Sequence, residues 1–169
     1  MNATNPPVWA AGTLLVAIGP GAAGKSTWAD AAATAVDAVV SLDALRQEIG
    51  GDAGDQSATP AAVARQNALL ERYLAAGVTV FVDSTNVEPR VRAGLVERAR
   101  RYGRPVIALR FLPDLGTCMA RNRLRPANRR VPDAALRWQY ALAQEATPQT
   151  LLAEGFTAAH QITPDPSGI

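Results

Sequence analysis

The sequence contains little cysteine and little histidine. Among its 169 residues there is one cysteine, Cys118, and one histidine, His160. A single thiol cannot form an internal disulfide, and one cysteine cannot build a cysteine-based zinc site. We therefore expect Cys118 to be a small residue of the core and His160 to be structural rather than catalytic.

Lysine is nearly absent too. Lys25 is the only lysine, and every other basic side chain is arginine. A genome-wide preference for arginine codons explains most of this pattern, and it has spared one position that needs a compact point charge. The formal net charge of +2 says little by itself about a nucleic-acid partner.

Long apolar runs are also missing. The longest runs, at residues 13–18 and 78–82, are strand-sized and far below the roughly 20 residues of a membrane span. Residues 1–7 show no secretory signal, so we expect a cytoplasmic protein without a membrane segment. A chain of this length can bury one good core, and we expect residues 1–169 to form a single domain with its core at about 13–162.

Residues 19–26, GPGAAGKS, match the GxxxxGK[ST] pattern of a phosphate-binding loop, the P-loop. An apolar run precedes the loop and a helix-forming stretch follows it, which is the context that this pattern requires. Its backbone N–H groups would face phosphate oxygens, while Lys25 would reach the outer phosphates and Ser26 would ligate magnesium. We therefore expect ATP and Mg²⁺ as cofactors. The residues expected to bind the nucleotide here are Gly19, Gly21, Ala22, Ala23, Gly24, Lys25, Ser26 and Thr27.

Strand and helix patterns alternate along the chain. Strands are expected at 13–18, 38–42, 78–82, 105–111 and 155–162, and helices at 25–36, 59–76, 88–102, 113–124 and 132–144. The helix at 59–76 has Thr59 as a capping hydroxyl and Pro60 in its first turn. This order predicts an α/β fold, a P-loop kinase-like parallel sheet of about five strands flanked by helices. The tail from Thr163 onwards is expected to be frayed.

Two aspartates follow expected strands and should share one rim of the sheet with the P-loop. Asp43 could act as the base for an attacking hydroxyl, with Arg46 holding an anionic group of the acceptor. Alternatively, Asp43 caps a helix and Arg46 is solvated. Asp83 has the position of a Walker B aspartate that orients magnesium, or it belongs to an ordinary turn.

An arginine-rich stretch, residues 121–130, interrupts two expected helices around Pro126. A mobile lid has this form, and lid arginines such as Arg125 and Arg129 neutralise charge on a transferring phosphoryl group. The alternative is a solvated basic face.

Several of these stretches together resemble the kinase domain of polynucleotide 5′-hydroxyl kinases, which heal nucleic-acid ends. The resemblance runs over about residues 13–162. It rests on GKSTWA at 24–29, SLDALR at 41–46, GDQS at 54–57, VDSTNV at 82–87, RNRLR at 121–125 and RRVP at 129–132.

The resemblance implies a role for each matching residue. Asp43 would be the general base for the 5′-hydroxyl of DNA or RNA, and Arg46 would bind a neighbouring acceptor phosphate. Lys25 and Arg125 would stabilise the triphosphate and the transition state, and Arg121 would lie near the base of the nucleotide. The second lid arginine would be Arg129 or Arg130, because the preceding spacer varies in length. No DxDGT phosphatase motif is present, so healing of 3′ ends is not expected.

Two other functions remain open at this point. One is a P-loop kinase that phosphorylates a small-molecule hydroxyl of a metabolite, antibiotic or nucleotide sugar. The other is a nucleotide-dependent binding module without an acceptor, against which Asp43 argues. The sequence does not choose DNA over RNA, or ATP over GTP.

Overall fold

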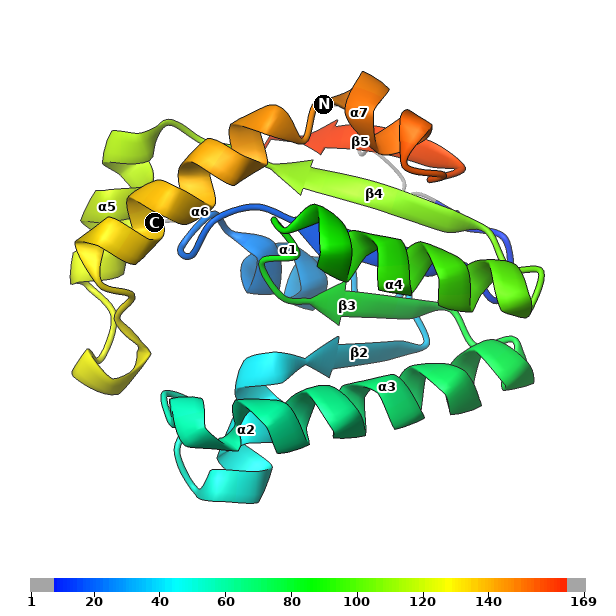
Figure 1. Ribbon diagram of the computed structural model, residues 1–169, viewed down its shortest axis with the longest axis horizontal. Coiled ribbons are helices and arrows are strands. Elements are labelled where there is room, and N and C mark those ends of the chain that lie inside the picture. Colours follow the sequence, from blue (N-terminus) through cyan, green and yellow to red (C-terminus); the bar gives the residue numbers. More distant parts are fainter. Residues whose placement is uncertain (1–7, 164–169) are drawn as a thin grey trace.

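The computed structural model describes residues 8–163, and five parallel strands form its central sheet (Figure 1). The strands are β1 (Leu14–Ile18), β2 (Ala38–Ser41), β3 (Val80–Asp83), β4 (Val106–Phe111) and β5 (Ala158–Ile162). Their order is β2-β3-β1-β4-β5. The predicted P-loop kinase-like sheet is thus confirmed. Residues 164–169, which belong to the tail predicted to be frayed, lie outside the described residues.

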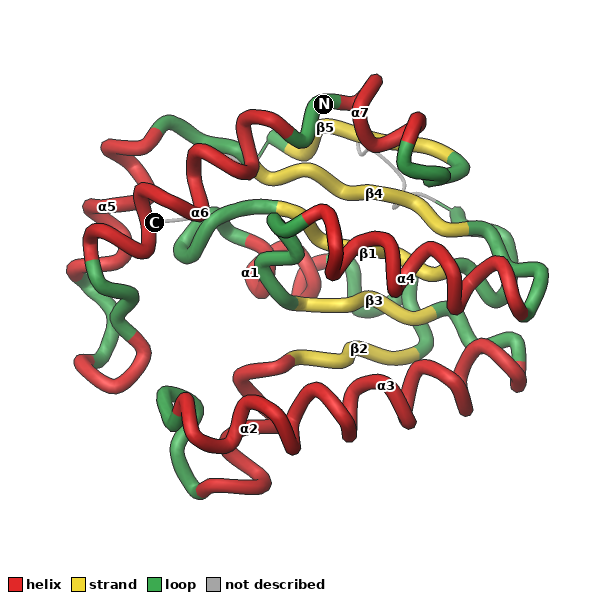
Figure 2. The backbone as a smooth tube through the Cα atoms, in the orientation of Figure 1, coloured by secondary structure: helices red, strands yellow, loops and turns green. Residues whose placement is uncertain are grey.

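Helices cover both faces of the sheet (Figure 2). They are α1 (Lys25–Ala31), α2 (Leu42–Gly50), α3 (Thr59–Ala76), α4 (Pro89–Arg101), α5 (Leu115–Arg123), α6 (Asp133–Glu145) and α7 (Pro148–Ala153). Two short 3-10 helices, η1 (Gln56–Ala58) and η2 (Ala127–Arg129), lie in the connections. None of the helices within residues 8–163 combines the length and the apolar composition that crossing a bilayer requires.

The alternation of side chains along β1 divides the core into two layers. Every residue of β1 is buried, as expected for a central parallel strand. Val16 belongs to the layer that includes Leu70 of α3 and Leu95 of α4. Leu15, one position earlier, belongs to the opposite layer, which includes Cys118 of α5 as a buried core residue.

Several predicted helix and strand boundaries are wrong. Tertiary contacts explain the difference at the end of α1. Helix α1 ends at Ala31 instead of residue 36. The cause is Asp37, whose carboxylate accepts a hydrogen bond from Thr79 N at 2.8 Å while its own N–H donates to Thr79 O at 2.9 Å. These bonds fix the chain at the entry to β2, so the helix must stop earlier.

Two further differences concern helix starts. Thr59 does not cap α3, because the N-cap position is Ala58 and the preceding turn η1 is capped by Asp55. Helix α7 was not predicted, although Thr147 caps it by accepting from Thr150 N and Pro148 lies in its first turn. β5 consequently begins only at Ala158.

Candidate active site

The P-loop connects β1 to α1 at the carboxyl end of the sheet. Gly19 N donates to Thr85 O at 3.0 Å. A Cβ atom at Gly19 would lie 2.2 Å from the carbonyl oxygen of Phe111, so only glycine fits this close approach. Ala22 and Gly24 both have left-handed backbone conformations, with φ of 59° and 96°. The loop is therefore held in a curved shape that favours glycine.

The backbone N–H groups of residues 22–27 are available to a ligand. Within the described residues they donate to no protein acceptor, whereas the N–H of Gly21 donates to Oε1 of Gln139 at 2.9 Å. Consecutive N–H groups without partners in a curved loop form an anion-binding concavity. One donor of the loop, Gly21 N–H, is bonded to α6 instead.

Lys25 is buried beneath the loop, with 8% of its surface exposed. Its Nζ donates to the carbonyl oxygens of Gly19, at 3.1 Å, and Pro20, at 2.5 Å. Burial lowers the pKa of Lys25 from 10.5 to about 8, and the negative charge of Asp83 opposes this effect. The ammonium group is therefore poorly solvated, and an incoming anion would stabilise it.

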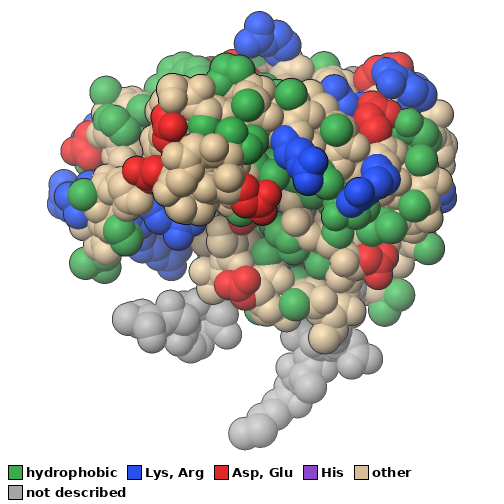
Figure 3. Space-filling model, turned by 90° about the horizontal axis from the view of Figure 1, so that it is seen from below, with side chains coloured by type: hydrophobic (Ala, Val, Ile, Leu, Met, Phe, Trp, Pro, Cys, Tyr) green, Lys and Arg blue, Asp and Glu red, His purple; other side chains and the backbone are tan. Residues whose placement is uncertain are grey.

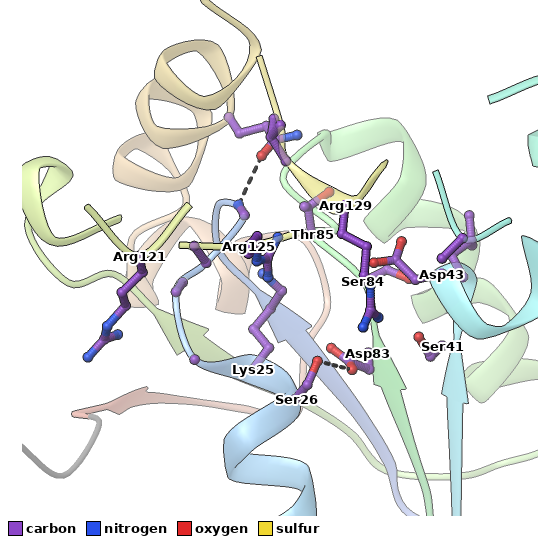
Figure 4. Close-up of a pocket in the computed structure, with 18 of the residues that line it drawn as sticks. Lys25, Ser26, Ser41, Asp43, Asp83, Ser84, Thr85, Arg121, Arg125 and Arg129 are labelled. Carbon is purple, nitrogen blue, oxygen red and sulfur yellow. Dashed lines mark hydrogen bonds between the residues drawn. The ribbon is translucent and has the colours of Figure 1, made fainter. Parts of the chain in front are cut away.

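Ser26 and Asp83 meet across the sheet rim. Asp83 is the last residue of β3, and its Oδ2 accepts a hydrogen bond from Ser26 Oγ at 2.7 Å (Figure 4). The pair offers the hard oxygen ligands that Mg²⁺ prefers. No group of three or more His, Cys, Asp and Glu side chains suited to a metal occurs within residues 8–163. A magnesium ion at this pair would therefore need phosphate and water oxygens as further ligands, which is usual for Mg²⁺.

Asp43 lies in the first turn of α2 rather than at a strand end. The helix is capped by Ser41, whose Oγ accepts from Ala44 N, so the reading of Asp43 as the N-cap is wrong. Nη2 of Arg46 donates to Oδ1 of Asp43, and Nε of Arg46 donates to Ala53 O at 2.8 Å. The Arg46 side chain is only 13% exposed, which also excludes the alternative of a solvated arginine.

The lid, residues 124–132, connects α5 to α6, and its residues line the same pocket as the P-loop and Asp43. Figure 4 shows the side chains of Arg125 and Arg129 directed into the pocket, near Asp43 and Asp83. Burial lowers the pKa of Arg125, while the charge of Asp43 raises it and that of Arg129 lowers it again. The side chain of Arg130 instead donates to Arg125 O at 3.0 Å, within the lid.

These elements enclose one large cavity of about 1180 Å³. All the predicted site residues line this cavity except Gly19, which is bonded to the lining residues Lys25 and Thr85. Basic side chains gather at the lid end of the molecule, on the left in Figure 3. The predicted site residues that line the cavity are Gly21, Ala22, Ala23, Gly24, Lys25, Ser26, Thr27, Asp43, Arg46, Asp83, Arg121, Arg125 and Arg129.

Sequence reasoning missed three residues that shape the site. Gln139 accepts a hydrogen bond from the N–H of Gly21. Asn128 of the lid and Gly54 lie at the contact between the lid and the loop at residues 52–54, which is bonded to Arg46. The string GDQS already marked Gly54 as part of a resemblance, without a role. Nothing in the local pattern around Gln139 or Asn128 indicated either contact.

A family model described as an AAA domain matches residues 14–146 of the chain. This match spans the P-loop, both aspartates and the lid. A comparison with curated protein sequences gives no match.

Several solved structures have the same fold. Kti12 of Chaetomium thermophilum, in complex with ADP-AlF3, aligns with a TM-score of 0.67 and 16% identity over 90% of this chain and 89% of that one. The Pnkp1/Rnl/Hen1 RNA repair complex aligns with a TM-score of 0.66 and 20% identity, over 86% of this chain and 47% of that chain. A gluconokinase from Sinorhizobium meliloti 1021 aligns with a TM-score of 0.54 and 20% identity, over 89% of this chain and 81% of that chain. At these identities the likeness is one of fold.

Proposed function

The chain belongs to the AAA domain family, and on that premise we propose that it transfers the γ-phosphoryl group of ATP to a hydroxyl, with the 5′-hydroxyl end of DNA or RNA as the acceptor. One observation carries the proposal. A carboxylate, Asp43, faces the same cavity as a complete P-loop with its lysine and two lid arginines. A switch or binding module needs the loop but has no use for a base on the acceptor side.

The donor nucleotide would be held mainly by the chain's backbone. The N–H groups of residues 22–27 would bind phosphate oxygens, and Lys25 would exchange its two carbonyl partners for the outer phosphates. Ser26 and Asp83 would hold Mg²⁺, which when bound neutralises charge on the β- and γ-phosphates. Arg121 lines the same cavity and would lie near the base.

The lid arginines would act on charge that develops during transfer. Arg125 and Arg129 point towards the space between the P-loop and Asp43, where the γ-phosphoryl group would pass (Figure 4). Positively charged groups fixed at that position stabilise the transition state more than the ground state. Because Arg130 is engaged with the lid backbone, we propose Arg129 as the second lid arginine.

The acceptor would approach from the side of α2. Asp43 would accept the proton of the attacking hydroxyl, which requires an ionised and accessible carboxylate; its side chain is 44% exposed. The hydrogen bonds that Arg46 makes within the described residues use Nε and Nη2. Its Nη1 would therefore bind a phosphate of the acceptor strand without release of Asp43.

A second candidate is a kinase for a small neutral hydroxyl compound. The observation in its favour is that Arg46 is already neutralised by Asp43 and bonded to Ala53 O. In that case Arg46 would serve only to orient Asp43. The fold likeness to a gluconokinase is compatible with this candidate, just as the likeness to an RNA repair complex is compatible with the first.

A transfer assay with γ-labelled ATP and Mg²⁺ tests the proposal. We expect label on 5′-hydroxyl DNA or RNA strands and on nucleoside 3′-monophosphates, and little on plain nucleosides or neutral sugars. The variant Lys25→Ala should lose most of the activity, whereas the exposed Arg90→Ala on α4 should retain it. Efficient labelling of a neutral compound with none of any 5′-hydroxyl strand would select the second candidate.

A further inference from the structure

The tip of the lid rests on a loop of the acceptor side. Nδ2 of Asn128 donates to Oδ1 of Asp52 at 3.0 Å, and the same oxygen accepts from Gly54 N at 2.8 Å. A Cβ atom at Gly54 would lie 1.9 Å from the carbonyl oxygen of Asn128. The lid backbone therefore lies directly on the loop backbone, at a distance that no side chain at position 54 permits.

The loop beneath the lid is itself tied to α2. Ala53 N donates to Oε1 of Gln47 at 3.1 Å, and Ala53 O accepts from Nε of Arg46 at 2.8 Å. Arg46 in turn pairs with Asp43. An unbroken series of contacts thus runs from Asn128 through residues 52–54 to the carboxylate that faces the cavity.

We propose that Asn128 and Gly54 are positioning residues, which hold the lid closed on the loop at 52–54 and so place Arg129 over the cavity. The loop at residues 52–54 then contacts both the closed lid and α2 on the acceptor side. A displacement of this loop would move Arg129 away from the cavity. The catalytic consequence rests on the proposed function, but the lid contact itself does not depend on it.

The contact is suited to repeated opening. Besides the backbone contact at Gly54, it includes one side-chain hydrogen bond at the molecular surface, with Asn128 exposed. A hydrogen bond to a charged group changes an equilibrium by roughly tenfold or more. Hydrogen bonds from Gly54 N–H and from Asn128 lower the pKa of Asp52, so the accepting carboxylate is ionised at neutral pH. A lid held this weakly can release product and still be closed for most of the time.

Limited trypsin digestion measures lid opening without any ligand. Arg129 and Arg130 are cleavage sites next to Asn128, and cleavage in the native protein follows the population of the open lid. Gly54→Ala leaves the lid sequence unchanged and removes the space for its backbone. We expect cleavage at these two sites to be roughly three- to tenfold faster than in the wild type. The control Gly94→Ala, whose Cβ would meet only the flexible end of Arg98 at 3.3 Å, should show no change.

A charge exchange tests the side-chain bond separately. Asn128→Asp places two carboxylates opposite each other and should also speed cleavage, after correction for the rate in the urea-unfolded chain. Adding Asp52→Asn should restore part of the wild-type rate, because it removes the repulsion between the two carboxylates, although Oδ1 of Asp52 also accepts from Gly54 N. Wild-type cleavage in both Gly54→Ala and Asn128→Asp, or no rescue in the double variant, would overturn the lid contact.

Turnover provides the catalytic readout. Gly54→Ala should lower kcat by roughly tenfold with a smaller effect on the KM for ATP, because a misplaced lid arginine loses transition-state contacts. Unchanged kcat together with faster cleavage would overturn the positioning of Arg129. If no acceptor is phosphorylated by any variant, the proposed function fails, and the digestion still decides on the lid contact.

Discussion

Replacing Lys25 by methionine should remove a pH dependence from the stability of the unliganded protein. The pKa of this buried lysine is about 8, against 10.5 for an exposed lysine, and the main cause is burial. Below pH 8 the side chain is charged in both the folded and the unfolded states, so the full cost of burying the charge is present. Between about pH 8 and 10.5 the folded state loses its proton first. The stability of the wild type therefore rises with pH in this range.

The size of the effect follows from the two pKa values. Their difference corresponds to about 3 kcal/mol of unfolding free energy, most of which is recovered by pH 10. Methionine has a similar unbranched shape and does not titrate. Relative to Lys25→Met, the wild type should thus gain about 2 to 3 kcal/mol between pH 7 and pH 10.

Urea unfolding of both proteins at pH 7 and pH 10 measures this gain. Groups that do not interact with Lys25 affect both proteins equally and cancel in the comparison. The charge of Lys25 lowers the pKa of Cys118, so both proteins should carry Cys118→Ala. Because the chain contains one lysine, lysine labelled with ¹³C gives one Cε signal that reports the titration directly. A midpoint near 10.5 in the folded protein, or a free-energy difference that does not change with pH, would refute the reasoning.

Three further predictions concern single side chains. Asp43→Asn should bind ATP as the wild type does and lower kcat by about 10²- to 10⁴-fold, because an amide keeps the bond from Arg46 but cannot take a proton; parental turnover would exclude Asp43 as the base. Arg125→Ala should lower kcat more than it weakens ATP binding, and Arg130→Ala should do less in the same assay; equal small effects would indicate a solvated face. Arg92→Ala should cost about 3 to 5 kcal/mol in urea unfolding, since it leaves the paired carboxylate of Glu154 without its partner. The exposed Arg90→Ala on the same helix is its control, and a similar loss in both would contradict this role.

The parts of the fold that were predicted correctly depend on neighbouring residues in the sequence. β1 and the P-loop follow from an apolar run and a glycine pattern, and the side chains of Asp43 and Arg46 meet because they are one helical turn apart. The carboxyl-end rule for parallel sheets also placed Asp83 beside the loop, where it contacts Ser26.

The contacts that were missed join distant parts of the chain. Gln139 and Gly21 are 118 residues apart, and Asn128 and Asp52 are 76 residues apart. Such contacts depend on how the lid and α6 pack over the sheet, which no local spacing encodes. The early end of α1 has the same cause, because Asp37 is bonded to Thr79. By contrast, Thr147 and Pro148 carried an ordinary start signal for α7 that could have been recognised.

The sheet order has a consequence for synthesis on the ribosome. β1 pairs with β3 and β4, at Val80 and Val106, and not with the strand that follows it along the chain. It is therefore made long before either neighbour exists, and at 5–20 residues per second the second neighbour emerges on the order of ten seconds later. During that delay a wholly apolar strand has unsatisfied edges on both sides, which makes it prone to aggregation. The strand that leads into the phosphate loop thus waits longer along the chain for its full set of partners than any other strand of this sheet.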